Sequence, residues 1–201
     1  QETEITVPET ELEKEVTVDG INITGMSRDE AKAAILKDFP WGMKVTWQDQ
    51  SYDVNDLMAE KVDSLLQEIY TGEPKESCTL DTAGLEDAAA KEAETVAGLW
   101  NKKAKNGSIS EYDASSDKFL FKGAENGLAV DQDQLKADIL AALSRKDFTA
   151  TIAATVNEVE PEFSEAVARE KYKTIGTFTT NTTSNQKRNT NVKLAAKAIN
   201  G

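Results

Sequence analysis

The alternation of apolar and polar residues is clearest in residues 126–161, where it predicts a strand, a helix and a second strand in succession. Leu128 and Val130 form a short apolar strand that ends at Asp131, a residue type favoured as a helix N-cap. Asp131 is expected to accept from the amide of Gln134, whose side chain would return the bond in a capping box. The predicted buried helix face, at i, i+4, i+7 and i+8, consists of Leu135, Ile139, Ala142 and Leu143. The β-branched segment TATIAATV then predicts the second strand.

The same helical spacing recurs elsewhere in the chain. It predicts helices at residues 28–38, 56–70 and 85–101, in addition to the helix at 132–143. Ser27 followed by Glu30 is the pattern of a capping box at the start of the first of these helices. A weak similarity between GINITGMSRDEAKAAIL and GLAVDQDQLKADIL leaves open an internal duplication or the ordinary appearance of any strand-to-helix joint.

Strand patterns complete the expected fold. A strand near Val16 to Ile23 is interrupted at Asp19-Gly20 by a bulge or a tight turn. Two hairpins are predicted, with turns at residues 48–51 and 114–117. We therefore expect an α+β fold whose helices pack on a mainly antiparallel sheet, with strand-helix-strand units near the start and end and room for one parallel pair.

Composition narrows the classes of function. The 201-residue chain carries a formal net charge of −13, which argues against nucleic acid and anionic membrane surfaces as partners. No apolar stretch approaches the roughly 18 residues of a spanning helix, so a soluble chain without direct membrane insertion is expected. The Thr-, Glu- and Pro-containing start is interpreted as a polar stalk that remains after removal of an export signal or anchor.

The absence of histidine removes the most common catalytic arrangements. It excludes Ser-His-Asp triads, Cys-His dyads and His-ligated metal sites, and a single cysteine, Cys78, excludes thiolate clusters and internal disulfides. Cys78 lies near Glu76 and Asp81, so we expect a small packed residue rather than a reactive thiol. No catalytic residue, metal site or cofactor is predicted.

Aromatic residues are the best candidates for ligand contacts. Trp100, Tyr70 and Trp47 fall on apolar faces and are expected in the core. Trp41 lies in a turn between Pro40 and Gly42, where exposure and burial remain equally open, and Tyr52 follows the first hairpin turn. Trp41 and Tyr52 are therefore the predicted ligand-binding residues.

Two acidic pairs could in principle act as a carboxylate pair. Asp131 and Asp133 already have a role at the helix N-terminus, and Glu158 and Glu160 are typical of a solvated strand face. We expect neither pair to be catalytic.

One long run carries a family resemblance. The segment KNGSISEYDASSDKFLFKGAENGLAVDQDQLKADILAAL, followed by TIAATVNEVEP, resembles the module assigned to peptidoglycan binding that precedes VanW domains and some L,D-transpeptidases in Gram-positive cell-envelope proteins. The opening VDGINITGMSRDEAKAAIL is similar to the segment that these proteins carry before the module. The tail EKYKTIGTFTTNTTSNQKRNTNVKLAAKAING resembles the start of a VanW domain.

The resemblance predicts a domain organisation. Residues 1–14 would be a stalk or linker, 15–160 the module, and 161–201 a linker with the truncated start of a VanW-like domain. A further division of the module into about 15–72 and 78–160 remains open. In the tail, residues 174–180 are expected to be extended. Residues 191–200 are expected to be helical, with an apolar face that has no partner in the chain and is mobile or docked on another molecule.

The resemblance also implies a function. It predicts a non-catalytic, extracytoplasmic module that binds, or is positioned at, the peptidoglycan or another polymer of the Gram-positive cell wall or membrane surface. The L,D-transpeptidase signature, which contains a histidine, is missing. Two alternatives stay open: a spacer or protein-interaction domain that positions a downstream domain without binding glycan, and, more weakly supported, a carboxylate-based glycan hydrolase.

Overall fold

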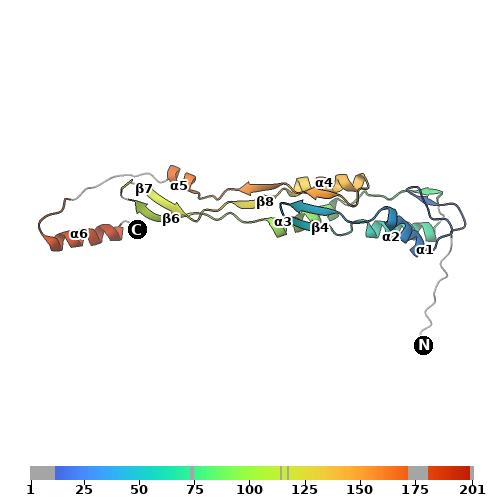
Figure 1. The fold of residues 1–201 in the computed structure, drawn as a ribbon, viewed down its shortest axis with the longest axis horizontal. Coiled ribbons are helices and arrows are strands. Elements are labelled where there is room, and N and C mark those ends of the chain that lie inside the picture. The colour runs from blue at the N-terminus through green and yellow to red at the C-terminus, as the bar shows by residue number, and fades with distance from the viewer. Residues whose placement is uncertain (1–11, 73–74, 114, 117, 172–180, 200–201) are drawn as a thin grey trace, which may run out of the picture. The chain divides into compact units, whose positions relative to one another are not determined.

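The computed structural model describes residues 12–72, 75–113, 115–116, 118–171 and 181–199. Helices and short strands are both abundant among them, which confirms the α+β class (Figure 1). The chain forms two compact units. Unit 1 contains residues 1–100 and 130–156, and unit 2 contains residues 101–129 and 157–201.

Unit 1 has two halves, and their elements alternate along the chain. The first half combines a three-stranded sheet with two helices. Its elements are β1 (Thr17–Val18), β2 (Ile21–Asn22), α1 (Arg28–Asp38), α2 (Ala59–Thr71) and β5 (Ser77–Cys78). β1 pairs antiparallel with β2 and parallel with β5, so the strand order is β2-β1-β5. The helices α1 and α2 pack against each other (Figure 1).

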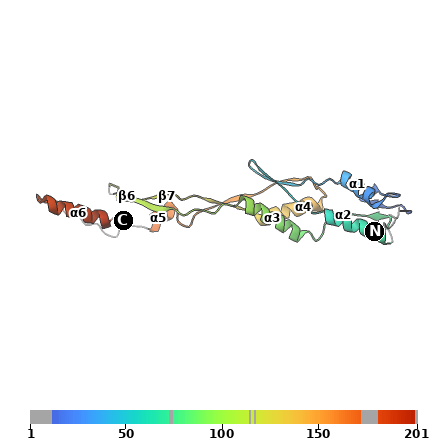
Figure 2. The same ribbon diagram turned by 90° about the horizontal axis from the view of Figure 1, so that it is seen from below.

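The second half of unit 1 repeats this arrangement. Its elements are β3 (Lys44–Trp47), β4 (Gln50–Asp53), α3 (Glu86–Trp100), α4 (Gln132–Ser144) and β9 (Thr151–Ala153). β3 pairs antiparallel with β4 and parallel with β9, and α3 packs on α4 (Figure 2). Each half is therefore a hairpin, two helices and a final strand that returns parallel to the first. The sequence similarity noted above aligns α1 with α4, which hold different places in the two halves.

Unit 1 contains one hydrophobic core. Among the described residues, every member of the core cluster lies in unit 1. The predicted face of α4 is confirmed, because Leu135, Ile139, Ala142 and Leu143 are all buried. The largest other side chains that are fully buried are Ile23, Ile35, Met43 and Leu66. Sequence periodicity therefore identified the surfaces that the helices bury.

Local signals explain how the elements begin and turn. Asp19 and Gly20 both have positive φ, 47° and 85°, so the expected interruption is a two-residue turn of the kind that joins twisted strands. The Ser27–Glu30 capping box is confirmed at α1. At α4, Asp131 accepts from the Gln134 amide at 3.0 Å, but the predicted return bond is wrong. The Gln134 side chain donates instead to Asp138, one turn further along the helix.

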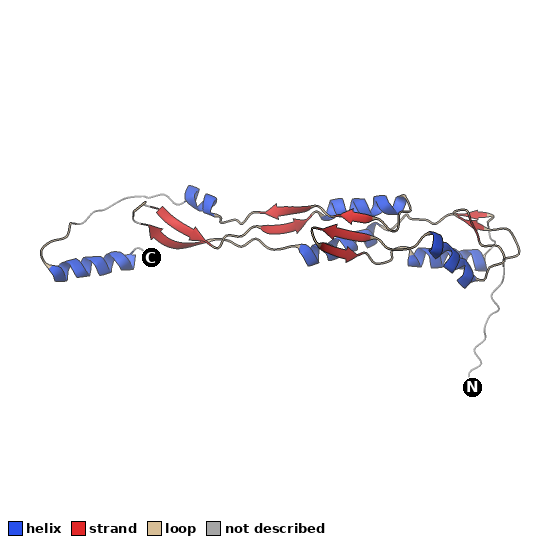
Figure 3. Cartoon of the chain, viewed as in Figure 1, coloured by secondary structure: helices blue, strands red, loops and turns tan. Residues whose placement is uncertain are grey.

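Unit 2 is built from paired extended segments and short helices (Figure 3). Lys102 pairs with Leu128 and Lys105 with Glu125 in antiparallel bridges, and Gly127 lies so close to this neighbouring segment that a Cβ would collide with its backbone. The remaining elements are β6 (Ser108–Asp113), β7 (Lys118–Lys122), α5 (Glu165–Lys171) and α6 (Gln186–Ile199), with α5 packed on β7. β8 (Gly127–Val130) and β10 (Val156–Val159) pair with each other.

The structure corrects three details of the predicted fold. The strands form several small sheets rather than one, and two of the described pairs, β1–β5 and β3–β9, are parallel. The predicted strand TATIAATV is divided between β9 and β10, which belong to different sheets. The tail helix begins at Gln186 rather than at Asn191.

Two further predictions concern segments and boundaries. The expected strand at 174–180 lies outside the described residues. The predicted domain boundaries at residues 72–78 and 160 do not coincide with the limits of the two compact units. These boundaries come from the family resemblance, and they stay predictions.

Candidate functional site

Trp41 is held within unit 1 by two contacts. Its Nε1 atom donates to the carbonyl oxygen of Val54 at 2.9 Å, and its ring stacks on Phe148 with a centroid separation of 6.1 Å and an interplanar angle of 27°. The side chain is half-buried. The indole N–H and much of one ring face are therefore engaged inside the protein.

Tyr52, the second predicted ligand residue, is bonded to a buried carboxylate. Its hydroxyl donates to Glu92 Oε2 at 2.8 Å, and Asn55 Nδ2 donates to Glu92 Oε1 at 2.8 Å. The backbone amide of Asn55 gives a third, longer bond of 3.3 Å to Glu92. Glu92 is only 5% exposed, the one charged residue among the described residues that is buried. Three donors from β4 and the segment after it thus satisfy a carboxylate on α3.

This contact shifts the ionisation of Tyr52. Desolvation, followed by the hydrogen bond to Glu92 and the negative charge of Glu92, raises the pKa of Tyr52 to about 12. A phenol with so high a pKa stays protonated and keeps donating to the carboxylate. The geometry is that of a structural link between β4 and α3.

Sequence reasoning did not identify Glu92, although a signal exists. Leu85, Ala89, Glu92, Val96 and Trp100 follow the helical spacing i, i+4, i+7, i+11 and i+15, so Glu92 falls on the apolar face of α3. A charged residue at such a position needs buried donors. Their identity depends on β4, which is distant in sequence.

The other aromatic residues mostly follow the core prediction. Trp100 is buried and lies 6.2 Å from the half-buried Trp47, measured between ring centroids. The Tyr70 hydroxyl donates to the carbonyl oxygen of Met26 at 2.8 Å. Trp41 and Tyr52 bond different partners, the carbonyl oxygen of Val54 and the carboxylate of Glu92.

Two of the four acidic candidates, Asp131 and Glu158, form structural hydrogen bonds. Asp131 caps α4, and Glu158 accepts from Asn126 Nδ2 at 3.0 Å. Across the residues that the structure describes, no group of three or more acidic or cysteine side chains is arranged to hold a metal ion.

A second polar link connects distant parts of unit 1. Asp19 Oδ2 accepts from the Leu80 amide at 2.9 Å, and its Oδ1 forms an ion pair with Lys146. The side chains of Asp19 and Lys146 are only 12% and 28% exposed. This pair ties the β1–β2 turn to the loop after α4.

Open cavities lie among the described residues of unit 1. One of about 290 Å³ is lined by α2 and by the β5 segment, including Cys78, which is a half-buried free thiol. A second of about 550 Å³ lies near Lys14 and Glu76, and a third of about 340 Å³ lies between α4 and β9. Neither Trp41 nor Tyr52 lines any of these three.

The β6–β7 hairpin of unit 2 exposes apolar side chains. Ile109, Phe119 and Leu120, here called the hairpin patch, are 45%, 40% and 45% exposed. Phe119 lies 5.3 Å from Tyr112 between ring centroids, across the two strands. Because Ile109 and Phe119 point to one face and Leu120 to the other, both faces of the hairpin carry exposed apolar surface.

Comparisons with known proteins add no assignment. No family model matches the chain, and neither the curated proteins nor the solved structures include a significant match. The resemblance to cell-envelope modules therefore rests on the sequence segments quoted above. None of the described helices is both long and apolar enough to cross a bilayer.

Proposed function

We propose that this chain is a non-catalytic, extracytoplasmic module of the bacterial cell envelope that positions a neighbouring VanW-type domain at the cell wall. The sequence resemblance supplies the cell-envelope setting, and the single observation that carries the positioning role is the distribution of apolar surface. The described core cluster lies wholly in unit 1, whereas unit 2 carries the exposed hairpin patch and α6, which buries no side chain. Such surface is typical of a segment that contacts another protein domain.

The hairpin itself supports this interpretation. A two-stranded hairpin is marginally stable in water unless something packs on it, and α5 covers only part of β6–β7. Phe121 meets Phe163 at 5.8 Å between centroids, yet Phe119 and Leu120 on the same strand stay exposed. The hairpin patch is therefore the surface that we assign to the neighbouring domain.

The predicted aromatic residues favour positioning over glycan binding. A sugar-binding aromatic residue needs an open ring face and polar groups nearby. Trp41 stacks on Phe148 and gives its N–H to Val54, and Tyr52 gives its hydroxyl to Glu92. The N–H group and one ring face of Trp41 and the hydroxyl of Tyr52 are thus engaged within the protein, so few of their groups remain for a ligand.

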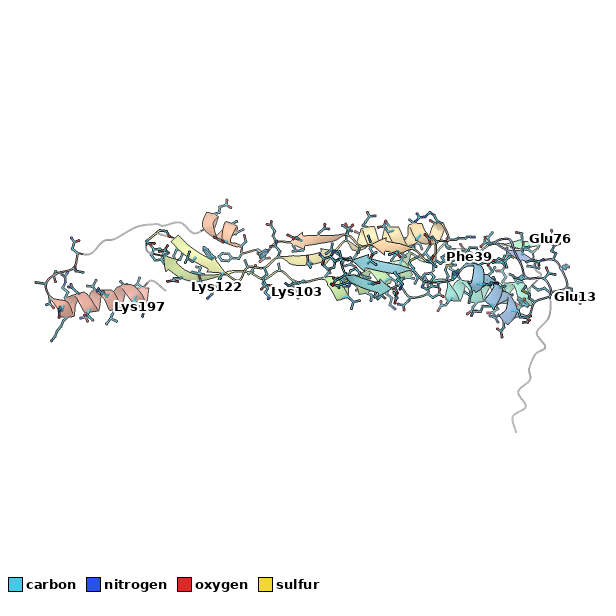
Figure 4. The ribbon with its side chains drawn as sticks, viewed as in Figure 1. Glu13, Phe39, Glu76, Lys103, Lys122 and Lys197 are labelled. Carbon is cyan, nitrogen blue, oxygen red and sulfur yellow. The ribbon has the colours of Figure 1, made fainter. Side chains whose placement is uncertain are left out.

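Direct binding of an anionic wall polymer is the second candidate, and one observation favours it. Residues 171–201 contain six Lys or Arg residues and no Asp or Glu, although the whole chain is acidic. Four of the six, Lys187, Arg188, Lys193 and Lys197, lie on α6 and are exposed. Lys197 is labelled in Figure 4. A local basic surface could attract phosphate-rich polymers despite the net charge of −13.

Sedimentation with purified cell-wall sacculi separates the two candidates. The positioning role predicts that the chain stays in the supernatant at low and at physiological salt. Polymer binding by α6 predicts salt-sensitive sedimentation that is lost on replacing Lys187, Arg188, Lys193 and Lys197 with Gln. The matched control replaces four exposed lysines of unit 1, Lys14, Lys37, Lys75 and Lys91, and so makes the same change in net charge.

A binding titration gives the positive test of positioning. The chain should bind a separately produced VanW-type domain, and Phe119→Ser combined with Leu120→Ser should weaken this binding by at least about tenfold, since apolar anchors dominate such contacts. Leu99→Ser is the control, because Leu99 is 62% exposed but lies on α3 in unit 1. Sedimentation with sacculi together with no effect of the hairpin substitutions would overturn the proposal.

A further inference from the structure

Strand β9 is an edge strand whose outer main-chain groups face a groove. In its parallel pairing with β3, Lys44 N donates to Ala150 O and Ala154 N donates to Thr46 O. In this hydrogen-bond register the N–H and C=O groups of residues 150, 152 and 154 point toward β3. The N–H and C=O groups of Thr151 and Ala153 consequently point away from the sheet.

The groove beside this edge is bounded by α4. Asp138 and Ala141 lie at i and i+3 on α4, next to the buried face that the helix turns to the core, and Arg145 is the C-cap residue that follows the helix. With Asp147 and β9 they enclose an open volume of about 340 Å³. This size is at the low end of ligand sites and suits a peptide of a few residues. The small side chain of Ala141 leaves space for the side chains of an added strand.

The charges around the groove select the kind of peptide. Two carboxylates, Asp138 and Asp147, and one guanidinium, Arg145, line it. The unit to which it belongs contains 27 acidic and 11 basic residues, so its field attracts a basic segment. A regular ladder with β9 also requires α-linked L-residues in extended form, which the γ-linked, D-residue-containing peptides of the cell wall do not supply.

We propose that β9 accepts an extended, basic segment of another protein as an additional strand, with its backbone on Thr151 and Ala153 and its basic side chains on Asp138 and Asp147. This site is separate from the hairpin patch and does not depend on the positioning role. An open edge of this kind is a ready template for strand addition.

Backbone-amide NMR on the whole chain tests the proposal. The probe is an acetylated, amidated Lys-Val-Lys-Val-Lys peptide, compared with Glu-Val-Glu-Val-Glu and with a Lys peptide methylated on every backbone nitrogen. We expect the Lys peptide to shift the Thr151 and Ala153 amide signals and to bind at least about tenfold more tightly than the Glu peptide. The methylated peptide, which cannot form the ladder, should not bind.

Two variants keep the outcome decisive. Ala153→Pro removes one outward N–H without removing a bond to β3, and Asp138→Lys with Asp147→Lys reverses the charge at the half-buried Asp138 and the exposed Asp147. Each should abolish the shifts caused by the Lys peptide. The proposal is overturned if the Thr151 and Ala153 signals do not move at millimolar peptide, or if the variants and both control peptides bind as the wild type and the Lys peptide do. The sedimentation test with cell-wall sacculi concerns the proposed function, so its result does not depend on whether the peptide binds to β9.

Discussion

The hydroxyl of Tyr52 donates a 2.8 Å hydrogen bond to the Oε2 atom of Glu92, and the two residues lie 40 positions apart in the sequence. The bond fixes the β3–β4 hairpin to α3 at a buried point. Since the other donors to Glu92 come from Asn55, at the end of the same hairpin, the whole link depends on one carboxylate. It converts a residue that would otherwise destabilise an apolar helix face into a specific connection.

Removing this carboxylate should destabilise unit 1. Glu92→Ala removes the charged acceptor shared by the half-buried Tyr52 hydroxyl and the exposed Asn55, which should lower the free energy of unfolding by about 1–3 kcal/mol. Tyr52→Phe should cost less, because Asn55 still donates to Glu92. Chemical denaturation, followed by tryptophan fluorescence, measures both.

Replacing both partners by apolar residues, Tyr52→Phe with Glu92→Leu, should cost less than the sum of the single changes. Additive costs would show that the bond contributes nothing specific.

The raised pKa of Tyr52 predicts a loss of stability in alkali. The pKa is about 12 in the folded chain, against about 10 for a free tyrosine. Because the folded pKa is the higher one, the stabilisation is complete below pH 10 and is lost as the pH rises toward 12. Denaturation midpoints between pH 9 and 12 should therefore fall more steeply in the wild type than in Tyr52→Phe. Parallel curves for the two proteins would contradict the assignment.

The Asp19–Lys146 pair should matter more than a surface ion pair. Asp19→Ala removes the acceptor of the Leu80 amide, leaves Lys146 without its carboxylate and places Ala at a positive φ. We expect a loss of about 1.5–3 kcal/mol, the range for hydrogen bonds to charged groups. Asp19→Asn should cost less, because Asn tolerates positive φ and still accepts from Leu80. Thermal unfolding of both variants provides the comparison, and equal losses would mean that the charge of Asp19 is the whole effect.

Helix α4 offers a direct comparison of core and cap. Leu135→Ala and Ile139→Ala should each cost about 2–5 kcal/mol, as large-to-small changes do in a closed core. Asp131→Ala should cost only about 0.5–2 kcal/mol, the value of an N-cap. Gln134→Ala should be nearly neutral, since its side chain bonds only Asp138 on the helix surface. Urea titrations give all four values, and equal losses at Asp131 and Leu135 would assign a further role to Asp131.

The sequence predicted features that depend on neighbouring residues. The caps Ser27 and Asp131 and the Asp19-Gly20 turn act within a few positions, and helical periodicity marked the buried faces correctly. The start of α6 was missed because its first turn, from Gln186, is polar. There Asn185 accepts from the Arg188 amide at 3.2 Å, a cap that apolar spacing does not reveal.

Features that depend on distant partners could not be predicted in the same way. The uniform alternation of TATIAATV gave no sign that β9 would pair with β3 and β10 with β8. Likewise, nothing local to Trp41 or Tyr52 indicates that Val54, Phe148 and Glu92 would engage them. The candidate ligand residues were therefore chosen on side-chain type alone, without the packing that decides their availability.

Hydrogen exchange across the whole chain tests most directly the claim that unit 1 holds the core while unit 2 presents surface for a partner. The amides of α4 at residues 135–143 should be protected close to the level of global unfolding. Those of the β6–β7 hairpin and of α6 should exchange at least about 100-fold faster, because few buried contacts oppose their opening. Equal protection of residues 108–122, 186–199 and 135–143 in the monomer would contradict the account, since unit 2 would then be stable without any partner.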